Sequence, residues 1–245
     1  MKVTYESTLT PVSVLTNSLK RSMFMLLESH FHNVTWKGFS KDLAKKDFVF
    51  VLTCKETSEL IGFSTQQILK SSKGEVVVFS GDTIIDPSAW GSLEFVKTWG
   101  LWMLSLSEAL GNTPLYWLLI SKGPRTYRYL PTFFEDFAPS VSRTYSERES
   151  SLILDVGIKL FGENLIKNTY GYFHVKHNKE SQFLKKHLLD EKTDVVHPSG
   201  VFFSNANPMY RSGSELVCLL RYSEDTMKPF CKRLLGLDTQ RQEAA

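Results

Sequence analysis

Apolar residues recur along this chain with two spacings, one typical of helices and one typical of strands. These spacings divide the first half of the chain into helices and strands. Leu15, Leu19 and Phe31 are separated by multiples of four, which predicts one apolar face of a first helix. Ser40 is expected to cap a short second helix that ends near Lys46. Strands are predicted where apolar residues run together or alternate with polar ones. These predicted strands are residues 3–9, 47–54, 60–69, 75–85 and 115–121.

The lengths of the connections predict how these strands pair. Short turns at 55–58 and 71–74 make the flanking strands antiparallel neighbours. A third helix is predicted from near Gly91 to Leu110, between strands 75–85 and 115–121. A crossover of that length makes the two strands parallel, with a right-handed connection. The first half is therefore predicted to be an α/β unit with a mixed, mostly antiparallel sheet.

The second half has less regular patterns. Residues 141–150 are polar and are predicted to connect the two halves. The elements expected beyond them are helices at 151–161 and 182–189, strands at 170–175, 201–203 and 215–222, and a last helix capped by Ser223. We expect two parts, residues 1–140 and a C-terminal α/β extension at 141–245. The extension completes or covers the site of the first part, either as a separate unit or within one compact domain.

Composition narrows the class of protein. The net charge of +3 over 245 residues is too small to favour nucleic acid as a partner. No apolar run approaches the ~20 residues that span a bilayer, so no membrane partner is expected. The three cysteines have no metal-binding spacing, which predicts no metal and fits a reducing compartment. With no apolar signal core at its N-terminus, the chain is expected to be cytoplasmic.

The strand at 75–85 runs through an Asp-Pro turn into the third helix. A helix N-terminus offers backbone N–H groups and a partial positive charge, which favour an anionic ligand. Ile85, Trp90, Gly91 and Ser92 are therefore candidate contacts for such a ligand. The sequence has no G-x-S-x-G, P-loop or dinucleotide-binding glycine pattern, so the corresponding enzyme classes lack sequence support.

The order of elements over residues 1–139 resembles the GCN5-related N-acetyltransferase (GNAT) superfamily. The resemblance implies splayed central strands flanked by helices, and a turn that holds the pyrophosphate of CoA. That turn usually carries a basic residue or Gln, followed by Gly-x-Gly or Gly-x-Ala. Gly91 matches the first glycine, whereas Trp90 stands at the basic position and Leu93 at the second small residue.

The resemblance also implies a reaction. An acyl group would pass from a thioester donor, either acyl-CoA or an acyl-carrier protein, to the amine of a small molecule or peptide. The departures at Trp90 and Leu93 leave three interpretations open. These are a modified CoA site, an acyl-carrier-protein donor, or a non-catalytic binding or interaction protein on the same fold.

Asp82 is the first candidate catalytic residue. It follows Gly81, and a glycine within a strand indicates a bulge or a close approach of two backbones. A carboxylate at this point can act as a base or hold a cationic substrate. An equally weighted alternative is a carboxylate that only hydrogen-bonds the backbone. His30 and His32, at the end of the first predicted helix, fit the favourable effect of a cation there.

Basic and aromatic residues cluster directly after the strand at 115–121. They are Lys122, Arg125, Tyr127, Arg128 and Tyr129. The three basic residues are candidates for pairing with CoA phosphates. The family often uses a Tyr on the following helix as the acid toward the leaving thiolate, which implies Tyr127 or Tyr129. The alternative is a solvated basic face with tyrosines in the core.

A polar segment at 204–215 separates two predicted apolar strands. Loops held by a rigid scaffold often line binding sites, so Asn205, Asn207 and Glu215 are candidate contacts for the acceptor. Asn and Gly in this segment can also simply supply turn geometry.

Overall fold

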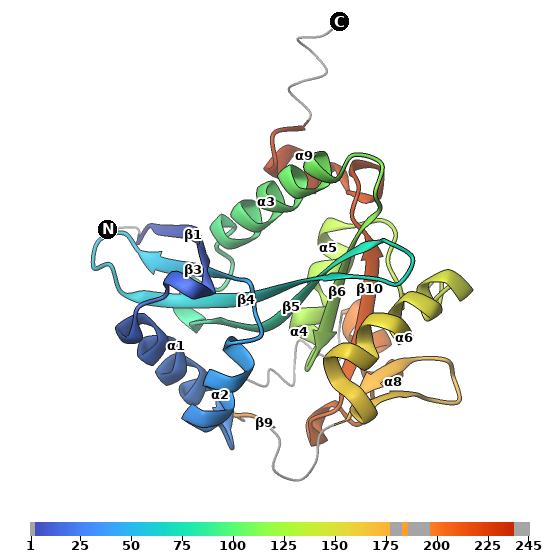
Figure 1. Cartoon of the computed structure of the whole chain (residues 1–245), viewed down its shortest axis with the longest axis horizontal. Helices are drawn as coiled ribbons and strands as arrows, with labels where there is room; N and C mark the ends of the chain where they lie inside the picture. The colour runs from blue at the N-terminus through green and yellow to red at the C-terminus, as the bar shows by residue number, and fades with distance from the viewer. Residues whose placement is uncertain (1–2, 177–182, 186–196, 238–245) are drawn as a thin grey trace, which may run out of the picture.

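The computed structural model describes residues 3–176, 183–185 and 197–237 (Figure 1). Within these ranges, strands from both halves of the chain form one eight-stranded sheet in the order β1-β3-β4-β5-β6-β10-β8-β7. The strands are β1 (Tyr5–Pro11), β3 (Phe48–Cys54), β4 (Leu60–Lys70), β5 (Val76–Ile85), β6 (Leu115–Ser121), β7 (Leu165–Lys167), β8 (Phe173–Val175) and β10 (Glu215–Arg221). A separate two-stranded sheet joins β2 (Phe31–His32) to β9 (Phe183–Leu184).

Only one pair of strands in the described large sheet is parallel. β5 and β6 run in the same direction, and each other neighbouring pair is antiparallel. This is the mixed, mostly antiparallel sheet predicted from the sequence, with the parallel pair where the crossover helix requires it.

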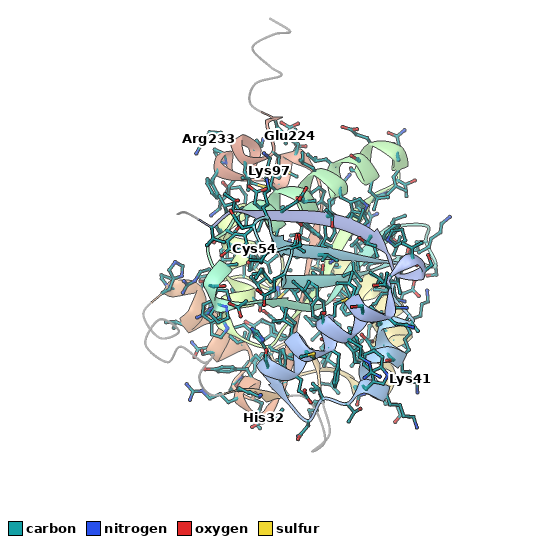
Figure 2. All side chains as sticks on the ribbon, turned by 90° about the vertical axis from the view of Figure 1, so that its left-hand side faces the viewer. His32, Lys41, Cys54, Lys97, Glu224 and Arg233 are labelled. Carbon is teal, nitrogen blue, oxygen red and sulfur yellow. The ribbon has the colours of Figure 1, made fainter. Side chains whose placement is uncertain are left out.

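Helices cover both faces of the sheet (Figure 1). They are α1 (Asn17–His30), α2 (Trp36–Leu43), α3 (Glu94–Leu110), α4 (Pro124–Tyr127), α5 (Tyr129–Phe133), α6 (Glu147–Phe161), α8 (Pro198–Ala206) and α9 (Pro229–Leu234). α3 and α9 lie on one side of the sheet, and α1 and α2 lie on the other. In Figure 2, Lys97, Glu224 and Arg233 mark the first side, and His32 and Lys41 mark the second. No helix in the described part of the chain has the length and apolar content needed to cross a bilayer.

The alternation of side chains along β5 divides the core between these two faces. Val76 and Val78 are buried in the cluster that includes residues of α3 and α9. Val77 and Phe79 are buried in the opposite cluster, which includes residues of α6. A third buried cluster joins α1 and α2 to the strands beneath them. The central strand is therefore apolar on both faces, as its near-continuous apolar sequence predicts.

A bulge interrupts this alternation near the end of β5. Two residues of β5, Gly81 and Asp82, lie opposite the single residue Thr65 of β4. A Cβ atom at Gly81 would lie 2.6 Å from Oγ1 of Thr65 and 3.0 Å from Cε of Lys46. Gly81 is therefore needed for close approach, and the prediction of a bulge or close contact here is confirmed.

The two parallel strands separate at the same point. Their register ends at Ser80 and Leu119. Beyond it, β5 stays paired with β4 as far as Ile85. β6 stays paired with β10 as far as Ser121. The strands thus diverge toward their C-terminal ends, as the resemblance to the GNAT superfamily implied.

Several predicted boundaries were wrong because a cap or a proline decides where a helix begins. α2 begins at Trp36, since Oγ1 of Thr35 accepts the backbone N–H of Gly38 at 3.1 Å. Ser40, the predicted cap, lies inside the helix. α6 begins before the predicted start at Ser151, because Ser146 forms a capping box at its N-terminus.

Two elements near the C-terminus also differ from their predictions. The predicted strand at 201–203 is part of α8, whose first turn contains Pro198. The predicted last helix is divided into a short 3₁₀ turn (Glu224–Thr226) and α9, which begins at Pro229. The predicted helix at 182–189 lies mostly outside the described residues, and its described part, Phe183–Leu184, is strand β9.

Candidate functional site

Two cavities lie on opposite faces of the sheet and meet where β5 and β6 separate. The first, which we call the α2 cavity, has a volume of about 500 Å³ and lies beside α2. The second, which we call the α3 channel, has a volume of about 200 Å³ and runs between α3 and α5. Both are bordered by Phe31, Thr83, Ile84, Leu119, Lys122 and Thr126. A ligand in each cavity would therefore meet the other at this junction.

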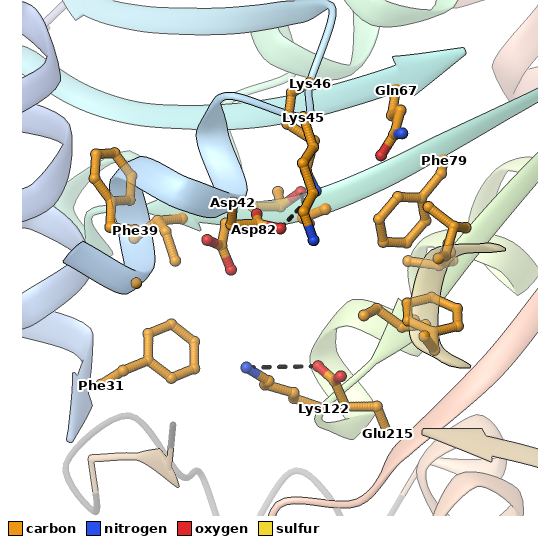
Figure 3. Close-up of a pocket in the computed structure, with 18 of the residues that line it drawn as sticks. Phe31, Phe39, Asp42, Lys45, Lys46, Gln67, Phe79, Asp82, Lys122 and Glu215 are labelled. Atoms are coloured by element: carbon orange, nitrogen blue, oxygen red, sulfur yellow. Dashed lines mark hydrogen bonds and ion pairs between the residues drawn. The ribbon is translucent and has the colours of Figure 1, made fainter. Parts of the chain in front are cut away.

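Charged side chains face one another across the α2 cavity (Figure 3). Nζ of Lys46 lies 2.9 Å from Oδ1 of Asp42, next to Asp82. On the other side, Nζ of Lys122 lies 3.5 Å from Oε1 of Glu215, which is buried. The cavity therefore presents both signs of charge in a partly enclosed volume.

Asp82 is placed in this cavity by the bulge in β5. No hydrogen bond or ion pair to its carboxylate is made by the residues that the structure describes. Removal from water raises the pKa of Asp82, while the ammonium group of Lys122 opposes this shift and the carboxylate of Asp42 adds to it. Asp82 is thus available to a ligand, and it is not the backbone-bonded carboxylate of the alternative interpretation.

A buried polar network crosses three strands at the base of the α3 channel. The Ser80 hydroxyl donates to Oε1 of Gln66 at 2.7 Å, and Nε2 of Gln66 donates to Oγ of Ser64 at 2.8 Å. Nε1 of Trp117 donates to the Ser80 hydroxyl at 2.9 Å, and the hydroxyls of Ser64 and Thr83 lie 2.7 Å apart. The network fixes β4, β5 and β6 where the sheet opens.

The outer end of the α3 channel is bridged by two side chains from different segments. Nε1 of Trp90 donates to the carbonyl of Ile85 at 2.9 Å, which holds the indole over the end of β5. The guanidinium of Arg125, from α4, lies over the indole ring. All three residues line the channel, and Trp90 is 42% exposed. The bridge therefore lies where a ligand would enter from solvent.

The turn before α3 keeps the backbone features of an anion site. Gly91 has a φ of +94°, a conformation that favours glycine. Leu93 occupies the N-cap position without a side-chain cap, while the Ser92 hydroxyl accepts the N–H of Glu94, the first residue of α3, at 3.4 Å. Gly91 and Ser92 line neither cavity, and the exposed Leu93 does not fill the channel.

The structure separates the two candidate tyrosines. Tyr127 is buried in the core, where its hydroxyl donates to the carbonyl of Pro139 at 2.9 Å, and it lines neither cavity. Tyr129 lines the α3 channel, and its hydroxyl has no hydrogen-bond partner among the described residues. Burial raises the pKa of Tyr129, against the opposing charge of Arg125. Only Tyr129 is therefore placed to meet a ligand.

The three candidate acceptor contacts are also separated. Asn205 is exposed on α8 and lines neither cavity. Asn207 is fully buried, and its Nδ2 donates to the carbonyl of Ser214 at 2.8 Å. Glu215 alone reaches the α2 cavity. Among the basic candidates, Lys122 borders both cavities and Arg125 lines the channel, whereas Arg128 lines neither.

Some residues that the structure brings to the site were not among the candidates predicted from the sequence. Asp42 and Lys46 were treated as part of a short helix, although an acidic and a basic residue four apart predict an ion pair on one face. Gln66 is fully buried in the middle of β4. A polar residue at the centre of an apolar strand was the available signal, because such a group must find buried partners.

Similar proteins are found among solved structures. No family model and no curated protein matches this chain. Solved structures similar to it include the ribosomal-protein-S18-alanine N-acetyltransferase from Escherichia coli, at 10% identity over 89% of this chain and 97% of that one, with a TM-score of 0.41.

Two further similar structures are also of acetyltransferases. A GNAT family N-acetyltransferase from Escherichia coli in complex with CoA has 13% identity over 55% of this chain and 72% of that one, with a TM-score of 0.39. An acetyltransferase from Trypanosoma brucei has 17% identity over 46% of this chain and 82% of that one, with a TM-score of 0.32. The element order and the splayed parallel pair described above are those that the resemblance to the GNAT superfamily implied, and the fold of this chain is GNAT-like.

Proposed function

We propose that this chain transfers an acyl group from the thioester of an acyl-CoA to the amine of a small molecule or peptide. The observation that carries this proposal is the junction between the α3 channel and the α2 cavity. A thioester arm entering from one face and an amine entering from the other would meet there. Holding two reactants in this way turns a bimolecular reaction into one between neighbours.

The α3 channel has the properties required of the donor site. Its walls are largely apolar, with Phe95, Trp99 and Phe133 among the lining residues, which suits the arm of a CoA thioester. The turn at Gly91 and Ser92 and the first turn of α3 would hold the phosphates. Arg125 would add positive charge once it leaves Trp90.

The α2 cavity has the properties required of the acceptor site. In this proposal Asp82 holds the ammonium group of the acceptor close to the junction, with Glu215 adding negative charge to the cavity. Tyr129 donates a proton to the sulfur when the thioester bond breaks, since its hydroxyl has no competing partner among the described residues. Tyr127 has no part in the reaction.

Thermal unfolding with thioester ligands tests the proposed function. A donor present at 100 times its Kd adds ~2.7 kcal/mol of stability, which raises Tm by roughly 5–10 °C for a chain of this size. We expect acetyl-CoA or a longer acyl-CoA to give this rise, and CoA itself to give part of it. A rise in Tm with acyl-carrier protein but not with acyl-CoA would show that the donor is acyl-carrier protein. No rise in Tm with any thioester would refute the proposal.

The bridge between Trp90 and Arg125 supports a second candidate function. If the bridge does not open, the chain is a non-catalytic binding or interaction protein on a GNAT-like fold. Trp90→Ala separates the two candidates, because it removes the cover from the channel. Binding of CoA by this variant and not by the wild type would show a closed donor site.

A further inference from the structure

His30 is a buried histidine at the wall of the α3 channel. It is the last residue of α1 and is 7% exposed. It lines the channel, and the next residue, Phe31, borders both cavities at their junction. His30 thus lines the channel and is next in sequence to a residue of the junction, although it does not itself line the α2 cavity.

Hydrogen bonds define which ring nitrogen of His30 carries the hydrogen. Nδ1 lies 2.9 Å from the carbonyl oxygen of Leu26, one turn earlier in α1. A carbonyl oxygen can only accept, so Nδ1 must be the donor. The Ser29 hydroxyl also lies 2.9 Å from Nδ1. In the neutral ring, Nε2 then carries the free lone pair.

Nε2 of His30 has no hydrogen-bond partner among the residues that the structure describes. It is buried, and no residue in the described part of the chain makes a hydrogen bond with it. Buried polar atoms are rarely left this way, because they lose their bonds to water and gain nothing in return. An unpartnered lone pair on a side chain that lines a channel points to a ligand that brings a hydrogen.

We propose that Nε2 of His30 is the proton acceptor for the amine, an inference that rests on the proposed acyl transfer. The acceptor ammonium, held by Asp82, gives one proton to Nε2, and the ring becomes imidazolium. The neutral nitrogen attacks the thioester carbon, so a C–N bond forms and the C–S bond breaks. Tyr129 protonates the departing sulfur and recovers a proton from the attacking nitrogen. The proton on His30 then passes to solvent.

The surroundings of His30 favour this division of roles. Lys122, at the junction, pairs with Glu215 at 3.5 Å, and its ammonium group lies 4.7 Å from the centre of the Phe31 ring. Asp82 faces lysines in the α2 cavity and serves as the anion that holds the cationic substrate. Imidazole is the side chain most often used for proton transfer in catalysis.

The first test uses His30→Gln, with His32→Gln as the matched control. His32 lies two residues along the chain and is exposed. Thiol release from acetyl-CoA would be measured with a panel of small primary amines as acceptors, from pH 5 to pH 9. We expect His30→Gln to lower kcat by about 10²-fold or more and to remove one ionisation from the pH profile. The Kd for acetyl-CoA should stay within about twofold, and His32→Gln should match the wild type.

The outcomes separate the two proposals. If wild-type protein binds acetyl-CoA and His30→Gln keeps the rate and the pH profile, His30 is not the proton acceptor and the acyl transfer stands. If the wild type binds no thioester, the proposed function fails and the role of His30 fails with it.

A second measurement does not depend on turnover. Nitrogen-15 NMR of histidine-labelled protein reports which ring nitrogen carries the hydrogen. His30→Gln identifies the signals of His30 by their loss. We expect the neutral ring to carry its hydrogen on Nδ1. Finding the hydrogen on Nε2 would overturn the assignment even if no amine in the panel is acylated.

Discussion

The guanidinium carbon of Arg125 lies 3.5 Å from the centre of the indole ring of Trp90. Trp90 occupies the position where the GNAT superfamily usually has a basic residue or Gln. Arg125, from a different segment of the chain, brings a positive charge to the same place. The departure at Trp90 therefore does not leave this end of the channel without a cation. In the proposed function, this cation belongs to a bridge that the acyl donor would have to open.

This relationship predicts opposite effects of two substitutions on CoA binding. Trp90→Ala removes a cation–π contact of about 0.5–1 kcal/mol, so the Kd for CoA should fall roughly two- to fivefold. Arg125→Gln removes the charge that would meet the phosphates, so the Kd should rise roughly tenfold or more. Isothermal titration calorimetry measures both values. Lys41→Gln, on the exposed face of α2, is the control and should bind like the wild type.

The pKa of Asp82 predicts a trade-off between stability and activity. Burial raises the pKa of this carboxyl above its ordinary value of 3.8, so the folded protein binds the proton more tightly than the unfolded chain. The resulting cost is absent below the unfolded-state pKa, and it is complete once the pH exceeds the folded-state pKa. Asp82→Asn should therefore have a higher Tm than the wild type at pH 7, and the two should converge toward pH 4.

The same substitution should impair acyl transfer, because an amide cannot hold an ammonium group as a carboxylate does. Thermal scans across this pH range, together with an assay of thiol release, test both parts. Asp225→Asn changes an exposed carboxylate and should alter neither property. An unchanged KM for the amine in Asp82→Asn would remove Asp82 from the acceptor site.

The buried network at the splay predicts a sharp contrast between neighbouring glutamines. Gln66→Leu removes the acceptor of the buried Ser80 hydroxyl and a donor to the Ser64 hydroxyl, although Trp117 and Thr83 still contact these groups. An unsatisfied Ser80 O–H should cost about 1–3 kcal/mol. Gln67→Leu changes a residue that faces the α2 cavity and makes no such bond among the described residues. Urea unfolding should show a large loss for the first variant and a small change for the second. Equal losses would mean that the network does not stabilise the splay.

The two tyrosines of the basic cluster should respond differently to loss of the hydroxyl. Tyr129→Phe should lower kcat, by about 10²-fold if proton donation to sulfur limits the reaction, and should leave the free energy of unfolding unchanged. Tyr127→Phe removes the hydrogen bond to Pro139 and should cost about 0.5–1.5 kcal/mol of stability with kcat retained. If Tyr127→Phe lowered kcat and Tyr129→Phe lowered only stability, the roles of the two tyrosines would be exchanged.

The sheet was predictable because a local run or alternation of apolar residues indicates each of its main strands. The run at 115–121 is β6 without an error at either end, and the strand predicted at 75–85 differs from β5 by one residue. Connection lengths then determined which strands are parallel. The strand prediction for 201–203 was wrong because two adjacent Phe residues resemble a buried strand. A helix begins at Pro198 instead, with His197 as its N-cap.

The site was less predictable because its parts come from distant segments. Asp82 was a candidate because Gly81 marks a bulge, which is a local signal. Glu215 was expected where a polar loop meets the strand predicted at 215–222, and it is buried because β10 inserts between β6 and β8. No pattern in the first half predicts that insertion. The partners of His30 were likewise hidden, since the lack of a partner at Nε2 is a property of packing.

A crystal structure of the protein with bound CoA tests the central claim most directly. If the proposed acyl transfer is right, the CoA arm occupies the α3 channel and its sulfur lies at the junction bordered by Thr83 and Leu119. Arg125 should have left the ring of Trp90 to meet the phosphates. A channel that stays closed by Trp90 and Arg125 at saturating CoA, with no density for the ligand, would contradict it.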